Sequence, residues 1–172
     1  MTWKPGNLAN EAAKVRNEVV PYMRGVALDI GAGPFKVWPH FISVDSGMEF
    51  GRDRVDVVVD TAERLPLFAS GSVDVCFSSH LLEHIPYENV PAALREWFRV
   101  TKQFGHVILY LPSDQAYPLV GKPGSNCDHK WNCNYENVVA ALEQVECSWD
   151  MVDFQHRTDV DEYSLYVVLR KL

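Results

Sequence analysis

Three acidic residues each stand at the end of a short apolar run near the start of the chain, and a pair of glycines accompanies the first. Asp29 leads into Gly31 and Gly33, while Asp45 and Asp60 end the next two runs. Glycine lets main chain approach a ligand or take a positive φ, and a carboxylate accepts hydrogen bonds from ribose hydroxyls. Because ligands of open α/β sheets bind beyond the carboxyl ends of the strands, these residues predict a nucleoside pocket.

Three histidines could supply a general base near this pocket. His80 and His84 follow another apolar run, and His129 lies in a long irregular segment. The side-chain pKa of histidine is close to neutral, so its imidazole can take a proton from an acceptor hydroxyl. All three are therefore candidate catalytic residues. A surface or purely structural role is the alternative for each.

The elements that must position these groups can be predicted from the apolar pattern. Runs rich in β-branched residues and bounded by turn formers predict strands over residues 26–28, 41–44, 55–59, 73–78, 106–111, 147–154 and 163–169. Helical spacing predicts helices over residues 10–20, over 89–101 with Asn89 as a cap, and from a cap at Asn134. The last two strands must be antiparallel, because only residues 155–162 separate them. The sequence thus predicts an α/β, Rossmann-like, doubly wound and mostly parallel seven-stranded sheet with a C-terminal antiparallel hairpin.

Length and charge limit the classes of function. A chain of 172 residues fits a single domain spanning residues 1–172. The net charge of -7 and the lack of a basic run argue against nucleic acid as a partner. No signal-peptide core occurs in residues 1–10 and no apolar run is long enough for a bilayer, so we expect a cytoplasmic protein without a membrane partner. The oligomeric state stays open.

The spacing between the glycines and the second acid separates two kinds of nucleoside cofactor. A dinucleotide-binding unit needs a third glycine, a full helix, and an acid about twenty residues further on. Here Asp45 follows Gly33 by only twelve positions, and the segment between them is too short for that helix. The pattern therefore disfavours NAD.

Four segments together resemble the class I S-adenosylmethionine-dependent methyltransferases, in particular the compact methyltransferase type 11-like branch. They are LDIGAGP at 28–34, SVD at 43–45, DTAERLPLFASGSVDVCFSSHLLEHI at 60–85 and LREWFRVTKQFGHVILYLP at 94–112. The resemblance implies the class I fold, S-adenosyl-L-methionine as cofactor and methyl transfer as the reaction. Two departures stand out: Phe35 replaces a frequent glycine, and the residues at 102–105 replace a Lys-Pro-Gly-Gly turn.

The resemblance also assigns the cofactor contacts. The glycine loop would bind the methionine half with Asp29 orienting it, Asp45 would bind the ribose, the segment at 60–62 would meet the adenine, and the segment at 78–80 would border the methyl group. The implied cofactor-binding residues are Asp29, Gly31, Ala32, Gly33, Asp45, Ser46, Asp60, Thr61, Ala62, Ser78 and Ser79. The expected acceptor is a small molecule or a glycan-type compound.

Two other functions compete with this interpretation. The chain could be a non-catalytic S-adenosylmethionine-binding regulatory module. Alternatively, His80, Glu83 and His84 match the H-x-x-E-H pattern of zinc hydrolases, although Pro86 would cut the required helix short. Cys127, His129 and Cys133 lack zinc-site spacing. We therefore expect no bound metal.

Overall fold

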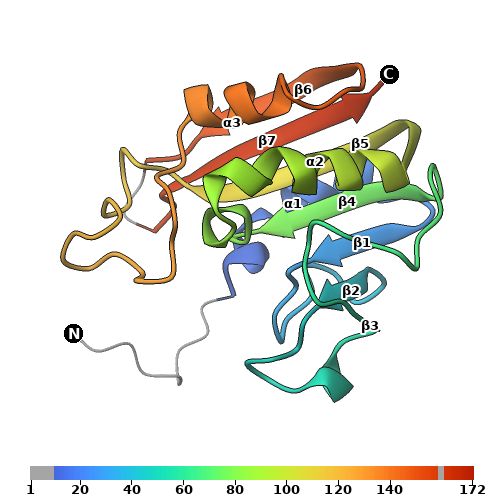
Figure 1. The fold of residues 1–172 in the computed structure, drawn as a ribbon, viewed down its shortest axis with the longest axis horizontal. Coiled ribbons are helices and arrows are strands. Elements are labelled where there is room, and N and C mark those ends of the chain that lie inside the picture. The colour runs from blue at the N-terminus through green and yellow to red at the C-terminus, as the bar shows by residue number, and fades with distance from the viewer. Residues whose placement is uncertain (1–9, 159–160) are drawn as a thin grey trace.

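The chain folds into a seven-stranded sheet with helices on both faces (Figure 1). The computed structural model describes residues 10–158 and 161–172. The strands follow the order β3-β2-β1-β4-β5-β7-β6. Strands β1 to β5 are mutually parallel, and β7 runs antiparallel to both of its neighbours. The predicted fold class, including the antiparallel C-terminal hairpin, is confirmed.

The strands are β1 (Ala27–Ile30), β2 (Ile42–Asp45), β3 (Val57–Val58), β4 (Val73–Ser79), β5 (Thr101–Pro112), β6 (Trp149–His156) and β7 (Ser164–Lys171). Strand β3 is shorter than predicted because, just before it, hydrogen bonds that involve side chains replace the backbone pairing with β2. The Asp56 carboxylate accepts from the Ser43 amide at 2.8 Å, and the Asp56 amide donates to the Ser43 hydroxyl at 3.0 Å. These bonds occupy backbone groups that a longer ladder would use.

Strand β5 begins five residues earlier than predicted. Val73 pairs with Thr101 while Val75 pairs with His106, so the residues between them bulge out of the ladder. Phe104 lies in this bulge with φ +62°. Residues 102–105, which stand where the family has a Lys-Pro-Gly-Gly turn, are therefore part of the strand and pass through its bulge.

The helices are short. The α-helices are α1 (Arg16–Val19), α2 (Val90–Val100) and α3 (Tyr135–Leu142), and the 3₁₀ turns are η1 (Glu11–Val15), η2 (Val20–Tyr22), η3 (Arg52–Arg54), η4 (Leu82–His84) and η5 (Tyr87–Asn89). The predicted helix over 10–20 is thus a 3₁₀ turn, one α-helical turn and a second 3₁₀ turn. Pro21 lies in the last of these, where it cannot supply a helical N–H donor.

Each face of the sheet has its own apolar cluster. Helices α2 and α3 cover one face with side chains that include Leu94, Trp97 and Leu142. The segment η1–α1 covers the other face, where Val15 and Val19 are fully buried. Figure 1 shows α2 and α3 in front of the sheet and α1 behind it. This layering leaves the carboxyl ends of β1, β2 and β4 open at one edge.

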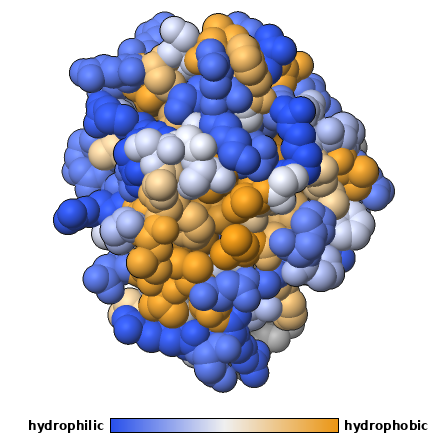
Figure 2. Space-filling model, turned by 90° about the vertical axis from the view of Figure 1, so that its right-hand side faces the viewer, coloured by the Kyte–Doolittle hydropathy of each residue, from blue (hydrophilic) through white to orange (hydrophobic). Residues whose placement is uncertain are grey.

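The opposite edge carries a different surface. Figure 2, which shows the molecule from the side where the parallel strands begin, has apolar residues gathered near its centre and hydrophilic residues around them. Within the described part of the chain, no helix is long and apolar enough to cross a membrane.

Candidate functional site

Two adjoining cavities lie at the carboxyl ends of the parallel strands. The first has a volume of about 520 Å³ and the second about 420 Å³, and both are lined by Gly31, Asp45, Ser46, Leu81 and His84. They therefore form one continuous cleft. Among the predicted cofactor contacts, Asp29, Gly31, Ala32, Gly33, Asp45, Ser46 and Ser79 line the first cavity, while Asp60, Thr61 and Ala62 line the second.

The glycine loop after β1 has room for a ligand at one glycine and none at the other. Gly31 has φ +72°, and a Cβ there would lie 2.7 Å from the Leu81 side chain. Gly33 has φ +57°, but no heavy atom of the described residues lies within 4 Å of the corresponding position. Gly31 is thus required by packing and conformation, whereas Gly33 borders open space in the first cavity.

The Asp45 carboxylate ties the glycine loop to the end of β2. Its Oδ2 accepts from the Gly33 amide at 3.1 Å, and its Oδ1 accepts from the Gly47 amide at 2.9 Å and the Ser46 hydroxyl at 3.4 Å. A carboxylate offers about four acceptor positions. Asp45 therefore keeps acceptor capacity for a ligand hydroxyl in the cleft that it lines.

Asp29, at the end of β1, forms a hydrogen bond across the glycine loop. Its side chain is buried and accepts from the Val37 amide at 2.6 Å. Burial raises the pKa of the Asp29 carboxyl to about 7, although the bond from Val37 opposes that shift. Asp29 thus joins the end of β1 to the segment that follows the glycine loop.

Ser78 and Ser79 differ in where they point. The buried Ser78 hydroxyl donates to the Ile30 carbonyl at 2.9 Å and lines neither cavity. Successive side chains of a strand point to opposite faces. Ser79 therefore borders the first cavity, and Ser78 fastens β4 to β1.

Several residues that line the cleft were not found by sequence reasoning. Asn10, Glu11 and Ala12 reach the first cavity from the N-terminal segment, and residues 48–50 reach it from the loop after β2. None of them lies next to a motif, so no periodic or motif signal marked them. Phe35, noted only as a departure from the family pattern, also lines the first cavity.

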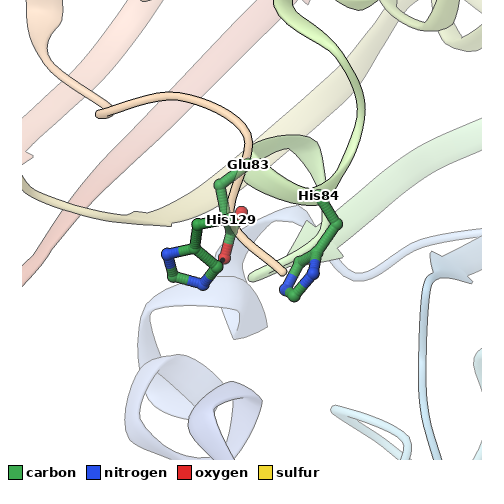
Figure 3. Close-up of side chains that lie close together, drawn as sticks. All are labelled: Glu83, His84 and His129. Carbon is green, nitrogen blue, oxygen red and sulfur yellow. Dashed lines mark ion pairs between the residues drawn. The ribbon is translucent and has the colours of Figure 1, made fainter. Parts of the chain in front are cut away.

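The three candidate histidines lie around Glu83, and Figure 3 shows His84 and His129 beside it. The His80 Nδ1 lies 3.4 Å from the Glu83 Oε1, and the His129 Nε2 lies 3.7 Å from the same oxygen. The rings of His84 and His129 are 4.9 Å apart and nearly perpendicular. His80 itself has φ +50°, and the residues from Leu82 to His84 form a 3₁₀ turn. The α-helix that the H-x-x-E-H arrangement needs is not formed there.

The pKa values of Glu83 and His129 are shifted by burial and by neighbouring residues of the cluster. Burial would raise the pKa of the fully buried Glu83 carboxyl, but His80 and His84 outweigh it and hold that pKa below its ordinary value. Burial lowers the pKa of His129 more than Glu83 raises it. Near neutral pH the cluster therefore contains an ionised carboxylate and a neutral His129 imidazole.

Comparison with known proteins agrees with the geometry of the cleft. Residues 28–109 match the family model of a methyltransferase domain. No curated protein matches the chain in sequence. The matched segment runs from β1 to β5 and so contains the glycine loop, η4 and all three acids at the strand ends, Asp29, Asp45 and Asp60.

The fold of this chain is similar to those of solved methyltransferases. An S-adenosylmethionine-dependent methyltransferase from Archaeoglobus fulgidus is 17% identical, with a TM-score of 0.66 over 94% of this chain and 92% of that one. One from Methanosarcina mazei is 16% identical, with a TM-score of 0.67 over 90% and 97%. The 1,6-didemethyltoxoflavin-N1-methyltransferase of Burkholderia thailandensis, solved with S-adenosylhomocysteine, is 17% identical, with a TM-score of 0.67 over 93% and 76%.

Proposed function

We propose that this chain is a class I methyltransferase that uses S-adenosylmethionine to methylate a small-molecule or glycan-type acceptor. Residues 28–109 match the family model of a methyltransferase domain, and the fold is similar to those of solved S-adenosylmethionine-dependent methyltransferases. The main observation behind the proposal is that several of the predicted cofactor-binding residues and two candidate catalytic histidines line the same cavity. The glycine loop and Asp45 line one part of it, and Ser79, His80 and His84 line another. A cofactor held at the loop would therefore share this cavity with side chains that could contact an acceptor.

The reaction needs positioning more than acid or base chemistry. When bound, S-adenosylmethionine supplies a methyl group on a sulfonium sulfur; the lone pair of an acceptor attacks the methyl carbon, and the sulfur leaves on the opposite side. The glycine loop would bind the methionine half through main chain, and Asp45 would accept from the ribose hydroxyls. Asp60, Thr61 and Ala62 line the second cavity, where the adenine would lie. This arrangement holds the reacting groups in the orientation that the displacement requires.

The acceptor class is proposed from size and charge. The first cavity, at about 520 Å³, falls within the usual range for small-molecule sites. The net charge of -7 disfavours a polyanionic acceptor such as nucleic acid. Glu11 adds a further carboxylate to the cavity wall. A neutral or cationic small molecule, including a sugar, is the acceptor that these observations favour.

Calorimetric titration with S-adenosylmethionine and S-adenosylhomocysteine, followed by a product assay over a panel of hydroxyl and amine acceptors, tests the proposal. We expect stoichiometric binding of both cofactor forms and a methylated product from at least one small acceptor. Failure of both cofactor forms to bind would remove the proposed function. Tight binding without turnover on any acceptor would instead favour the non-catalytic regulatory module.

A further inference from the structure

The Glu83 side chain is buried without the hydrogen bonds that a buried carboxylate normally has. It is fully inaccessible, and neither oxygen finds a hydrogen-bond partner among the described residues. The contacts to His80 and His129 bring ring nitrogens to 3.4 and 3.7 Å of Oε1, too long for good hydrogen bonds. An ionised group in such a site is costly unless a cation compensates it.

Two imidazoles are placed to share such a cation with Glu83. Glu83, His84 and His129 each offer a ligand atom, and the three atoms lie within 4.8 Å of one another. Figure 3 shows the Glu83 carboxylate between the two rings. Tetrahedral zinc with bonds of about 2.1 Å holds its ligand atoms about 3.4 Å apart. Side-chain rotations that move these atoms by about an ångström would therefore complete the site.

We propose that Glu83, His84 and His129 bind a divalent transition-metal ion of the zinc type beside the cofactor cleft. Two imidazole nitrogens and one carboxylate are a donor set that suits zinc and its neighbours among the transition metals. Three protein ligands with an open fourth position are typical of catalytic metal sites, whereas structural sites are closed. The proposal departs from the sequence-based expectation of no metal.

Main-chain contacts hold the ligands from distant parts of the sequence together. The Lys130 amide donates to the Glu83 carbonyl at 2.7 Å, and the Trp131 indole donates to the Leu82 carbonyl at 2.9 Å. The Tyr117 ring packs 5.3 Å from the His129 ring. These contacts fix the loop that carries His129 directly on η4, so the site does not depend on the metal for its overall position.

The metal would act on the acceptor, and this part of the inference rests on the proposed methyl transfer. His84 lines both cavities, so the proposed site adjoins the cleft through this ligand, and a fourth position on the His84 side would be open to an acceptor there. A metal ion lowers the pKa of an oxygen that it binds. An acceptor hydroxyl at that position would lose its proton to solvent, its oxygen would form the new bond to the methyl carbon, and the electrons of the broken carbon–sulfur bond would remain on sulfur. The acceptor class is therefore a hydroxyl compound.

Zinc titration of chelator-treated full-length protein tests the site without reference to activity. We expect one ion per chain in calorimetry, and an affinity at least about 100-fold weaker in Glu83→Gln and in His129→Ala, since even outer-shell changes cost 10 to 100-fold. Cys127→Ser and His40→Ala, which alter exposed residues outside the cluster, should bind like the wild type. Cobalt(II) in place of zinc should give a visible absorption that Glu83→Gln changes.

Three results would overturn the metal site: no saturable binding, an unchanged affinity in both cluster variants, or a loss of binding in Cys127→Ser. If circular dichroism shows that Glu83→Gln does not fold, His84→Gln replaces it, because this ligand is only partly buried. Titration with S-adenosylhomocysteine on the same samples separates the two proposals. Binding of S-adenosylhomocysteine without binding of zinc would leave the proposed methyltransferase function in place and overturn the metal site. Binding of zinc without binding of S-adenosylhomocysteine would leave the metal site in place and overturn the proposed function.

Discussion

At the scale of single residues, Asp45 is the most direct test of the cofactor site. Replacing Asp45 by alanine removes the carboxylate that, in our proposal, accepts from the ribose, and also the bond that holds the Gly33 amide. We expect the binding free energy of S-adenosylhomocysteine to weaken by roughly 1.5 to 3 kcal/mol. Isothermal titration measures this loss directly.

Asp45→Asn is the matched variant, because its amide oxygen can still accept from Gly33 while the negative charge is lost. Its affinity should fall between those of the wild type and Asp45→Ala. Equal affinities of the wild type and Asp45→Ala would show that the ribose is held elsewhere.

Asp29 gives a prediction about pH. Its folded-state pKa of about 7 lies above the ordinary 3.8, so the folded protein holds a proton that the unfolded chain has released. This contribution to the free energy of unfolding therefore falls as pH rises from about 4 to about 7, by about 1.4 kcal/mol per unit of pKa shift. Asp29→Asn should remove that decline, so the difference in stability between variant and wild type grows over this range.

Urea unfolding at a series of pH values measures the effect, and Asp74→Asn supplies a contrast. The bond from Lys102 holds the pKa of Asp74 below its ordinary value, so Asp74 stabilises the fold above that value and loses this contribution on acidification. The two variants should therefore deviate from the wild type with opposite signs near neutral pH. A parallel pH dependence in Asp29→Asn and the wild type would contradict the assignment.

The residues found from sequence are those that a strand presents at its end. Asp29 and Asp45 could be predicted because an apolar run leads into each of them and the sheet brings such ends together. The position of Glu11 in the cleft and the contact between His129 and Glu83 could not be predicted, because they join segments that are far apart in the sequence and share no motif. The loop that carries His129 is held beside Glu83 by bonds to backbone carbonyls of η4. Backbone carbonyls are the same in every residue type, so the sequence does not indicate these bonds.

At the scale of the elements, the two asparagines proposed as helix caps give a matched pair. The Asn134 side chain accepts from the Asn137 amide at 2.8 Å, which confirms its predicted role. Asn89 is followed by α2 but makes no side-chain capping bond, so that prediction is wrong. The 3₁₀ turn η5 runs directly into α2 and leaves Asn89 in helical geometry.

Asn134→Ala should lower the free energy of unfolding by about 1 to 2 kcal/mol, because it removes a cap and the bond that the Asn134 amide donates to Asp114. Asn89→Ala should change it by less than about 0.5 kcal/mol. Chemical denaturation of both variants measures the difference. Equal losses would show that the cap geometry at Asn134 contributes nothing specific.

Element type was more predictable than element length. The seven strands were predicted because β-branched runs are bounded by glycine, proline or acidic residues. Their ends shifted where tertiary contacts intervened, as at Asp56, whose side chain bonds to Ser43 in place of backbone pairing. The N-terminal helix lost its regularity because it is short and packs through only a few residues, such as Val15 and Val19.

At the scale of the whole molecule, cofactor binding should stabilise the fold. A ligand at 100 times its dissociation constant that binds only the folded state adds about 2.7 kcal/mol. For a chain of this size, that corresponds to an increase in Tm of several degrees. We expect this increase with S-adenosylhomocysteine and none with NAD at the same concentration, and thermal unfolding monitored by circular dichroism measures both. A comparable increase with NAD would mean that the cleft does not discriminate as the spacing of its acids indicates.

The attachment of residues 130 and 131 to η4 has a consequence for how the protein can diversify. The Lys130 bond involves only backbone atoms, and the Trp131 bond ends on a backbone carbonyl. The exposed Lys130 side chain can therefore be exchanged without loss of either bond, whereas the Trp131 indole cannot. Substitution at such a solvent-facing position can therefore alter the surface of this loop while His129 keeps its place beside η4.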